Sequence, residues 1–169
     1  MGRFVFAALV GAVVLISAFA GSASALAQDA SKIGVIDGNG QAASLETVLD
    51  GRRAVIHLWA TWCAPCLEEL PELADFLAAE PHLASHVVVL SVDTAPYSRV
   101  ERFLRQRLML PELASLKVVK GEMGSEFGVR GYPTTLFVDE SASVVERRTG
   151  MVDWRDPATK EALAAHFVK

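Results

Sequence analysis

The amino-acid sequence predicts a single α/β domain, in which one mixed β-sheet is covered by helices. Two near-continuous apolar segments, residues 54–60 and 86–93, have the composition of strands buried on both faces. Each is followed by a segment with helical periodicity, and two further strand patterns follow one another near the C-terminus. The chain has 169 residues and no internal repeat, which fits one domain and a short appendage.

The appendage is the N-terminal segment. Residues 1–20 contain one Arg near the start and then an uncharged apolar run, the pattern of a secretory signal peptide. Small-x-small cleavage sites follow at 23–25 and 25–27, and cleavage before Gln28 gives the mature chain a polar start. We therefore expect a signal peptide at residues 1–27 and a domain at 28–169. A retained membrane anchor is the alternative, although the run falls just short of the roughly 20 residues that span a bilayer.

The net charge of the mature chain and its expected export limit the classes of molecule that it can bind. Removal of residues 1–27 takes away one Arg and no acid, so 15 basic and 20 acidic residues leave the mature chain at −5. This balance disfavours nucleic acid and anionic lipid as partners. Export places the chain in the periplasm or another extracytoplasmic space, where a cysteine pair can cycle between dithiol and disulfide.

The elements are expected in the following order. A short strand, turn signals at 37–38 and 39–40, and one or two helical turns at 45–49 precede the first buried strand. An amphipathic helix follows from Cys63, then the second buried strand and a helical stripe at 97–108. Next come a short strand at 115–119, a short helix within 121–129, and paired strands at 134–139 and 143–150. A helix with Asp156 as N-cap and Pro157 at its first position ends the chain.

The helix that starts at Cys63 has an apolar face and an acidic face. Leu67, Leu70, Leu73, Phe76 and Leu77 form the expected buried stripe. Glu68, Glu69, Glu72 and Asp75 are expected to lie off it.

The only two cysteines, Cys63 and Cys66, stand at the start of this helix. Structural zinc usually needs four ligands, which one C-x-x-C and four scattered His do not supply. Covalent haem requires His directly after the second cysteine, where this chain has Leu67. A static disulfide that closes so short a loop would remove little entropy from the unfolded chain. We therefore expect no metal and no cofactor.

A reactive pair explains more features of this stretch. The N-terminus of a helix favours an anion, so Cys63 is expected to have a lowered thiol pKa and to act as the nucleophile. Cys66, one turn further on, is placed to attack a mixed disulfide formed on Cys63. Pro65 in the first turn costs no internal hydrogen bond and stiffens the loop.

Two motifs resemble the thioredoxin superfamily, and the likeness covers essentially the whole mature chain. "WCAPC" after a buried strand is similar to the thioredoxin active-site turn, and Pro71 matches the proline that kinks the following helix. "FGVRGYPTTLFVD" is similar to the segment with the cis-proline, here Pro133. The resemblance implies a thioredoxin fold, a redox-active Cys63–Cys66 disulfide, and substrate contact by Tyr132.

Within the superfamily, the sequence looks most like the TlpA/ResA/DsbE group of exported or membrane-anchored thiol–disulfide reductases, several of which serve cytochrome c maturation. This likeness implies an added strand and helix between the C-x-x-C helix and the cis-proline loop, within residues 81–131. Trp62, beside Cys63, is expected to shape the substrate-binding face, whereas Trp59 is expected to pack in the core.

Two residues near the cysteines have alternative interpretations. The group's acidic residue after the second cysteine corresponds to Glu69, which either exchanges a proton with Cys66 or is a solvated carboxylate beside Glu68 and Glu72. His57 stands where thioredoxin has a buried Asp. It is either a neutral core histidine that donates to a backbone carbonyl or a proton relay to Cys66.

The sequence thus predicts an extracytoplasmic thiol–disulfide oxidoreductase that reduces disulfides in envelope proteins and is itself reduced by a membrane-bound or soluble thiol donor. The direction follows from the Ala-Pro pair between the cysteines, which offers no His to stabilise the thiolate further. Three alternatives stay open: a disulfide oxidase or isomerase, a protein that handles Cu(I) with the same cysteines, and an inactive binding module with a locked disulfide.

Overall fold

A computed structural model describes residues 28–168 of the chain, and the expected signal peptide at 1–27 lies outside them. A seven-stranded sheet has the order β2-β1-β5-β4-β3-β6-β7. Its strands are β1 (Gly34–Ile36), β2 (Ala42–Ser44), β3 (Ala54–Trp59), β4 (Val87–Ser91), β5 (Leu116–Lys120), β6 (Thr134–Val138) and β7 (Val144–Thr149). Strands β3, β4 and β5 are parallel, and the other pairs are antiparallel, so the sheet is mixed.

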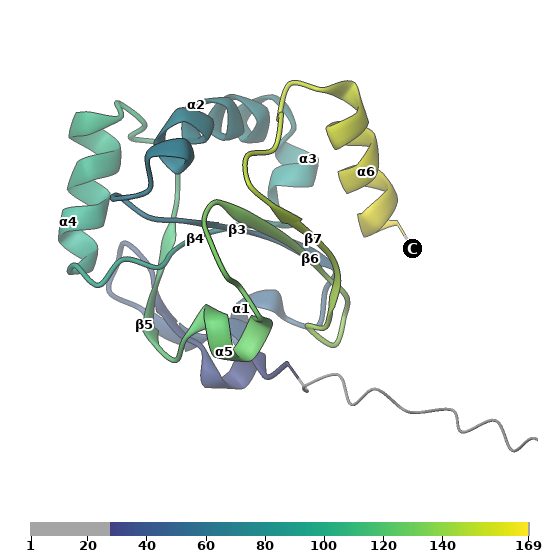
Figure 1. Ribbon diagram of the computed structural model, residues 1–169, viewed down its shortest axis with the longest axis horizontal. Helices are drawn as coiled ribbons and strands as arrows, with labels where there is room; N and C mark the ends of the chain where they lie inside the picture. The colour runs from purple at the N-terminus through teal and green to yellow at the C-terminus, as the bar shows by residue number, and fades with distance from the viewer. Residues whose placement is uncertain (1–27, 169) are drawn as a thin grey trace, which may run out of the picture.

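Helices cover both faces of the sheet (Figure 1). They are α1 (Leu45–Leu49), α2 (Ala64–Ala79), α3 (Pro81–Ala84), α4 (Tyr97–Arg102), α5 (Met123–Phe127) and α6 (Pro157–Phe167). Helices α2, α4 and α6 lie above the sheet in Figure 1, and α1 and α5 lie below it. None of the helices within residues 28–168 has the length and apolar composition that a membrane span requires.

The three layers enclose two hydrophobic clusters. Leu70, Leu73 and Phe76 of α2 pack on one face of the sheet, together with side chains of α4 and α6. Residues of α1 and α5 form the second cluster on the opposite face. Because strand side chains alternate between faces, Val55 and Trp59 of β3 join the first cluster and Ile56 and Leu58 join the second. His57 therefore lies on the α2 side of the sheet.

The predicted fold class is confirmed, and a strand and a helix lie between the C-x-x-C helix and the cis-proline loop, where the added pair is expected. These are β5 and α5, which follow α4 and precede the cis-proline loop. Strand β5 pairs with β4 and with β1, so the insertion joins the N-terminal strands to the rest of the sheet. Strand β2 and helix α3 were not expected as separate elements, and the predicted stripe at 97–108 becomes π-helical from Phe103 to Arg107.

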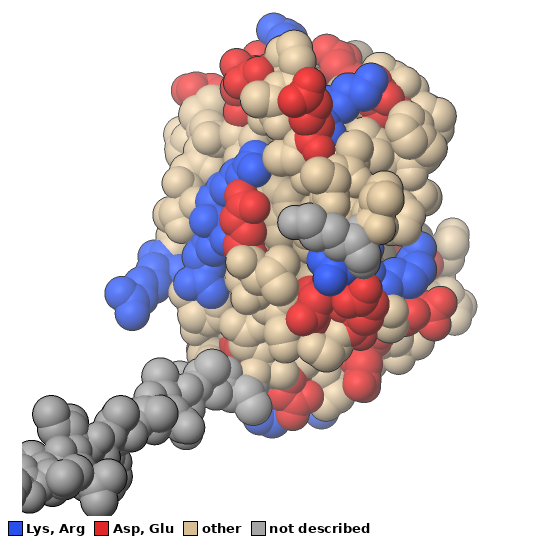
Figure 2. Space-filling view, turned by 90° about the vertical axis from the view of Figure 1, so that its right-hand side faces the viewer, with Lys and Arg blue, Asp and Glu red and all other residues tan. Residues whose placement is uncertain are grey.

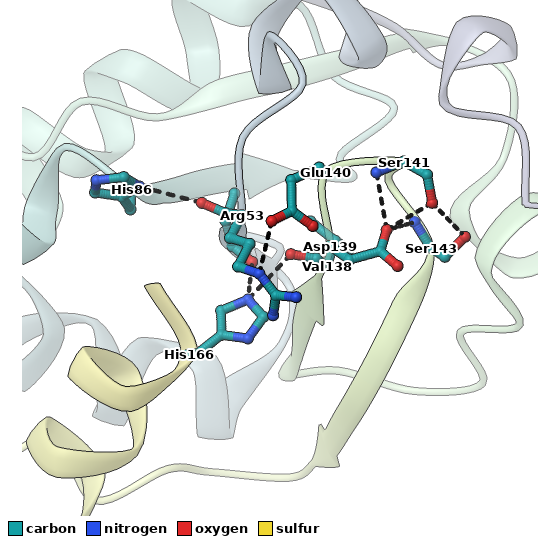
Figure 3. A network of polar contacts seen from close by, with 9 residues as sticks. Arg53, His86, Val138, Asp139, Glu140, Ser141, Ser143 and His166 are labelled. Atoms are coloured by element: carbon teal, nitrogen blue, oxygen red, sulfur yellow. Dashed lines mark hydrogen bonds and ion pairs between the residues drawn. The ribbon is translucent and has the colours of Figure 1, made fainter. Parts of the chain in front are cut away.

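Polar contacts fix α6 to the sheet at the end remote from the cysteines (Figure 3). The Nε2 atom of His166 donates to the carbonyl oxygens of Val138 and Ala54, at 3.0 and 3.3 Å. His86 Nδ1 lies 3.1 Å from the Arg53 carbonyl oxygen. The predicted N-cap is also confirmed, since the Asp156 side chain accepts a hydrogen bond from the backbone of the first turn of α6. The contacts of His166 thus fix the C-terminal end of α6 to the ends of β3 and β6.

Charged side chains of both signs share the face shown in Figure 2. Ion pairs of the described residues include Arg53–Glu140, Arg148–Glu146 and Lys160–Glu80.

Candidate active site

The cysteine pair lies between the end of β3 and the first turn of α2. Cys63 is the N-cap of the helix, and its Sγ accepts a hydrogen bond of 3.3 Å from the Cys66 backbone N–H. The two residues form a disulfide with their Cα atoms 5.3 Å apart. Cys63 is 6% exposed and Cys66 is fully buried, so Cys63 is the more accessible residue of the pair. The free N–H groups of the first turn favour a negative charge at this sulfur.

The turn before the cysteines is tied to the end of β4. The buried carboxylate of Asp93 accepts hydrogen bonds from the backbone and the hydroxyl of Thr61, at 2.9 and 2.6 Å. Ser91 Oγ donates to the same carboxylate at 3.0 Å. These contacts fix the position of the loop that presents Cys63. Pro65 lies in the first turn of α2, and the helix continues through Pro71 to Ala79.

The second motif lies beside the first. The Tyr132–Pro133 peptide bond is cis, as the resemblance implies, and Pro133 is buried. The Gly150 N–H donates to the Pro133 carbonyl oxygen at 2.9 Å, which joins this loop to the end of β7. Trp62 is 63% exposed and contacts Tyr132 edge-on, with ring centroids 5.7 Å apart. An exposed aromatic surface therefore connects the cysteine turn to the cis-proline loop.

Glu69 and His57 come together beneath this surface, and neither is solvated. Glu69 is 1% exposed and His57 is fully buried. Glu69 Oε1 accepts hydrogen bonds from the Val152 N–H at 3.1 Å and from Trp154 Nε1 at 2.6 Å. His57 Nδ1 is hydrogen-bonded to Thr135 Oγ1 at 3.0 Å and lies 3.8 Å from Glu69 Oε1.

Two details of the sequence prediction are therefore wrong. The expectation that Glu69 lies off the buried face fails because residue 69 stands four positions before Leu73 and seven before Phe76, which places it on the buried side of α2 and excludes the alternative of a solvated carboxylate. The expectation that His57 donates to a backbone carbonyl fails because the hydroxyl of Thr135, its neighbour on β6, is its hydrogen-bond partner.

Burial shifts both groups toward their neutral forms. Desolvation raises the pKa of Glu69 from 4.5 to about 7, although the hydrogen bonds from Trp154 and Val152 favour the carboxylate and partly oppose this rise. Glu72, on the same helix, adds a smaller upward contribution. Desolvation lowers the pKa of His57 from 6.5 to about 3, so this ring is neutral at ordinary pH. Glu69 is thus a buried carboxyl group that titrates near neutral pH, one helical turn from Cys66.

Comparison with known proteins identifies the family. The sequence matches the Redoxin family over residues 10–164. The chain belongs to the Redoxin family.

Curated relatives of this Redoxin-family chain carry names from thiol–disulfide chemistry. It is 27% identical over 116 residues to sporulation thiol-disulfide oxidoreductase A of Bacillus subtilis, a match that covers 67% of this chain and 65% of that protein. It is 31% identical over 114 residues to thiol:disulfide interchange protein DsbE of Pseudomonas aeruginosa, which covers 66% and 60% of the two chains. The chain therefore spans less than two thirds of the length of these relatives.

A solved structure confirms the thioredoxin fold of this Redoxin-family chain. The exposed lipoprotein thioredoxin Etrx1 of Streptococcus pneumoniae strain TIGR4 matches it with a TM-score of 0.59 and 22% sequence identity. The match covers 78% of this chain and 97% of that one.

Sequence reasoning missed two residues of the site, Asp93 and Trp154. Asp93 ends an apolar strand, and a carboxylate at the end of a buried strand next to a C-x-x-C turn is a signal that could have indicated it. Trp154 stands in the polar stretch "MVDWRDP", which has no periodicity to suggest burial. Among residues 28–168, no three His, Cys, Asp or Glu side chains form a cluster that could hold a metal ion.

Proposed function

We propose that this protein is an extracytoplasmic thiol–disulfide oxidoreductase that reduces disulfides in envelope proteins through Cys63 and Cys66. The observation that carries the proposal is a cysteine pair at a helix N-terminus, next to a cis-proline loop, of which Cys63 is the more accessible member. The names of the curated relatives agree with this chemistry. The signal peptide that the sequence predicts at residues 1–27 is the basis for proposing that the protein lies outside the cytoplasm, as a secreted or membrane-anchored domain.

The reaction transfers two electrons from the dithiol form to a substrate disulfide. The Cys63 thiolate attacks one substrate sulfur, a Cys63–substrate bond forms, the substrate disulfide breaks, and the leaving sulfur takes a proton. Cys66 then loses its proton and attacks Cys63 Sγ, which closes the Cys63–Cys66 disulfide and releases the second substrate thiol. An upstream thiol donor must reduce this disulfide before the next turnover.

The surrounding residues have distinct proposed roles. Trp62, Tyr132 and Pro133 bind the substrate segment beside its disulfide, and Pro65 and Pro71 shape the turn and the helix. Glu69 accepts the proton that Cys66 loses, which its pKa of about 7 allows near neutral pH. His57 is a neutral neighbour of Glu69. We propose that its ring also relays protons to Cys66, and a His57→Asn variant tests this role.

Trapping identifies the substrate and tests the order of attack. A Cys66→Ser variant should accumulate a mixed disulfide on Cys63, because no second thiol is present to resolve it. The matched control is Cys63→Ser, which should trap far less, since Cys66 is fully buried. Mass spectrometry of the adducts from envelope extracts would show whether apocytochrome c is among the substrates. Equal trapping by both variants, or by neither, would contradict the assigned roles.

Insulin reduction tests the activity and the proton transfer. The wild type should reduce insulin with a rate that rises as Glu69 ionises near pH 7, and Glu69→Gln should remove that rise. His57→Asn should alter the profile between about pH 5 and 8 only if this ring relays protons.

A reduction potential far below those of cellular thiol donors would indicate a locked disulfide, and Cu(I) binding without insulin reduction would indicate copper handling.

A further inference from the structure

The loop between β7 and α6 supplies the hydrogen bonds that Glu69 receives. Both donors, the Val152 N–H and the Trp154 indole N–H, belong to this loop, which is more than eighty positions away in the sequence. Trp154 is 2% exposed. Its ring lies between His57, edge-on at 5.7 Å, and Phe76 at 5.5 Å, measured between ring centroids. Contacts with two other elements therefore fix the direction of the indole N–H.

The two carboxyl oxygens of Glu69 differ in the hydrogen bonds that they accept. Both hydrogen bonds end on Oε1, whereas Oε2 is buried and has no hydrogen-bond partner in the described part of the chain. Neither N–H can accept a proton, so the acidic proton of Glu69 belongs on Oε2. The loop thereby determines which oxygen is free to exchange it.

We propose that Trp154 is a positioning residue for disulfide exchange: its indole N–H holds Oε1 of Glu69 and leaves Oε2 as the oxygen that exchanges a proton with Cys66. This inference rests on the proposed function of Glu69. As Cys66 attacks, its thiol proton passes to Oε2, the Cys66–Cys63 bond forms, and the bond from Cys63 to the substrate breaks. The released substrate thiolate takes a proton from water, and Glu69 later returns its proton to solvent.

Among the residues that the structure describes, His57 faces Glu69 from β3 and is neutral. Cys63 and Cys66, at the start of the helix that carries Glu69, form a disulfide in this structure. Glu72 also lies on that helix, where Arg155 pairs with it at 3.1 Å on the surface. The indole N–H is therefore the neutral donor whose loss should most directly favour the protonated form of Glu69.

The test replaces the indole with a ring that has no N–H. In Trp154→Phe, the midpoint of the Glu69 carboxyl titration, followed by ¹³C NMR and assigned with Glu69→Gln, should rise by about one pH unit or more. The rising limb of the insulin-reduction profile should move by the same amount, with the rate recovered at higher pH. Trp59→Phe is the matched control, because that fully buried indole donates to Ser115 instead, and it should leave the midpoint unchanged.

The outcomes separate this inference from the function on which it rests. An unmoved NMR midpoint would overturn the role of Trp154, whatever the activity. A midpoint that moves while the reduction profile stays in place would overturn the proton transfer by Glu69, and the inference with it. If Trp154→Phe fails to fold, 3-benzothienylalanine at position 154 replaces the N–H by sulfur in a ring of the same shape, and the same shift is expected.

Discussion

Removing the titration of Glu69 should change how the stability of the protein depends on pH. Burial raises its pKa from 4.5 to about 7, so the folded protein holds this proton more tightly than the unfolded chain does. The stability that results is complete below pH 4.5 and is lost as the pH rises through 7. One pKa unit corresponds to about 1.4 kcal/mol, so the loss amounts to up to about 3 kcal/mol.

His57 acts in the opposite direction. Burial lowers its pKa from 6.5 to about 3, so the folded protein binds this proton less tightly than the unfolded chain. The contribution of His57 to the free energy of unfolding is complete above pH 6.5 and is lost as the pH falls toward 3. At pH 4 the loss is about 3 kcal/mol. Between pH 4.5 and 6.5 the stability contributed by Glu69 falls with rising pH while that contributed by His57 rises. The two pH dependences largely cancel in the wild type, and single variants are needed to separate them.

Urea denaturation with the disulfide intact, between pH 4 and 8, measures these contributions. The free energy of unfolding of Glu69→Gln, relative to wild type, should rise by up to about 3 kcal/mol from pH 4 to pH 8. That of His57→Asn should rise by a similar amount from pH 7 to pH 4. Glu68→Gln, at an exposed position on the same helix, is the matched control and should show a flat difference. A flat difference for Glu69→Gln as well would refute the assignment of a raised pKa to this buried carboxyl group.

Two further predictions concern the scaffold of the site, and urea denaturation measures both. Leu73→Ala, at a fully buried position of α2, should lower the free energy of unfolding by about 2–5 kcal/mol, because it leaves a cavity beneath the helix that carries the cysteines. Asp156→Ala removes the side chain that accepts a hydrogen bond of 2.9 Å from the Ala158 N–H and should cost about 1 kcal/mol; Asp156→Asn, which can still cap the helix, should cost much less.

The elements that carry the site were accessible to sequence reasoning because their signals are local. Strands β3 and β4 are apolar runs buried on both faces, and the period changes to that of a helix at Cys63. Strand order is not local: β5 lies between β1 and β4 through pairings with segments far away in the sequence. The three-residue strand β2 is exposed or half-buried along its length, so no hydrophobic alternation marks it.

The residues of the site also differ in whether a local sequence signal or a distant contact determines their role. The cysteines and Pro133 belong to contiguous motifs and were predicted by residue number. The sequence does not decide between the two interpretations of Glu69, because its burial depends on Val152 and Trp154, which follow it by 83 and 85 positions. An acidic residue in a run of acidic residues has the same sequence pattern whether or not a distant loop covers it. Only the docking of residues 150–156 on α2 distinguishes the two interpretations.

The presence of His at position 57 determines which group titrates in this buried site. His57 Nδ1 lies 3.8 Å from Glu69 Oε1, and an acid at the same place, as in thioredoxin, would put two carboxyl groups in close contact. Such a pair shares its protons, and its pKa values belong to both groups together. A buried His avoids this coupling because it is already neutral well above its pKa of about 3. Of the pair His57 and Glu69, only Glu69 then titrates near neutral pH, so a change in rate near pH 7 that Glu69→Gln abolishes is assigned to the carboxyl group and not to the imidazole ring.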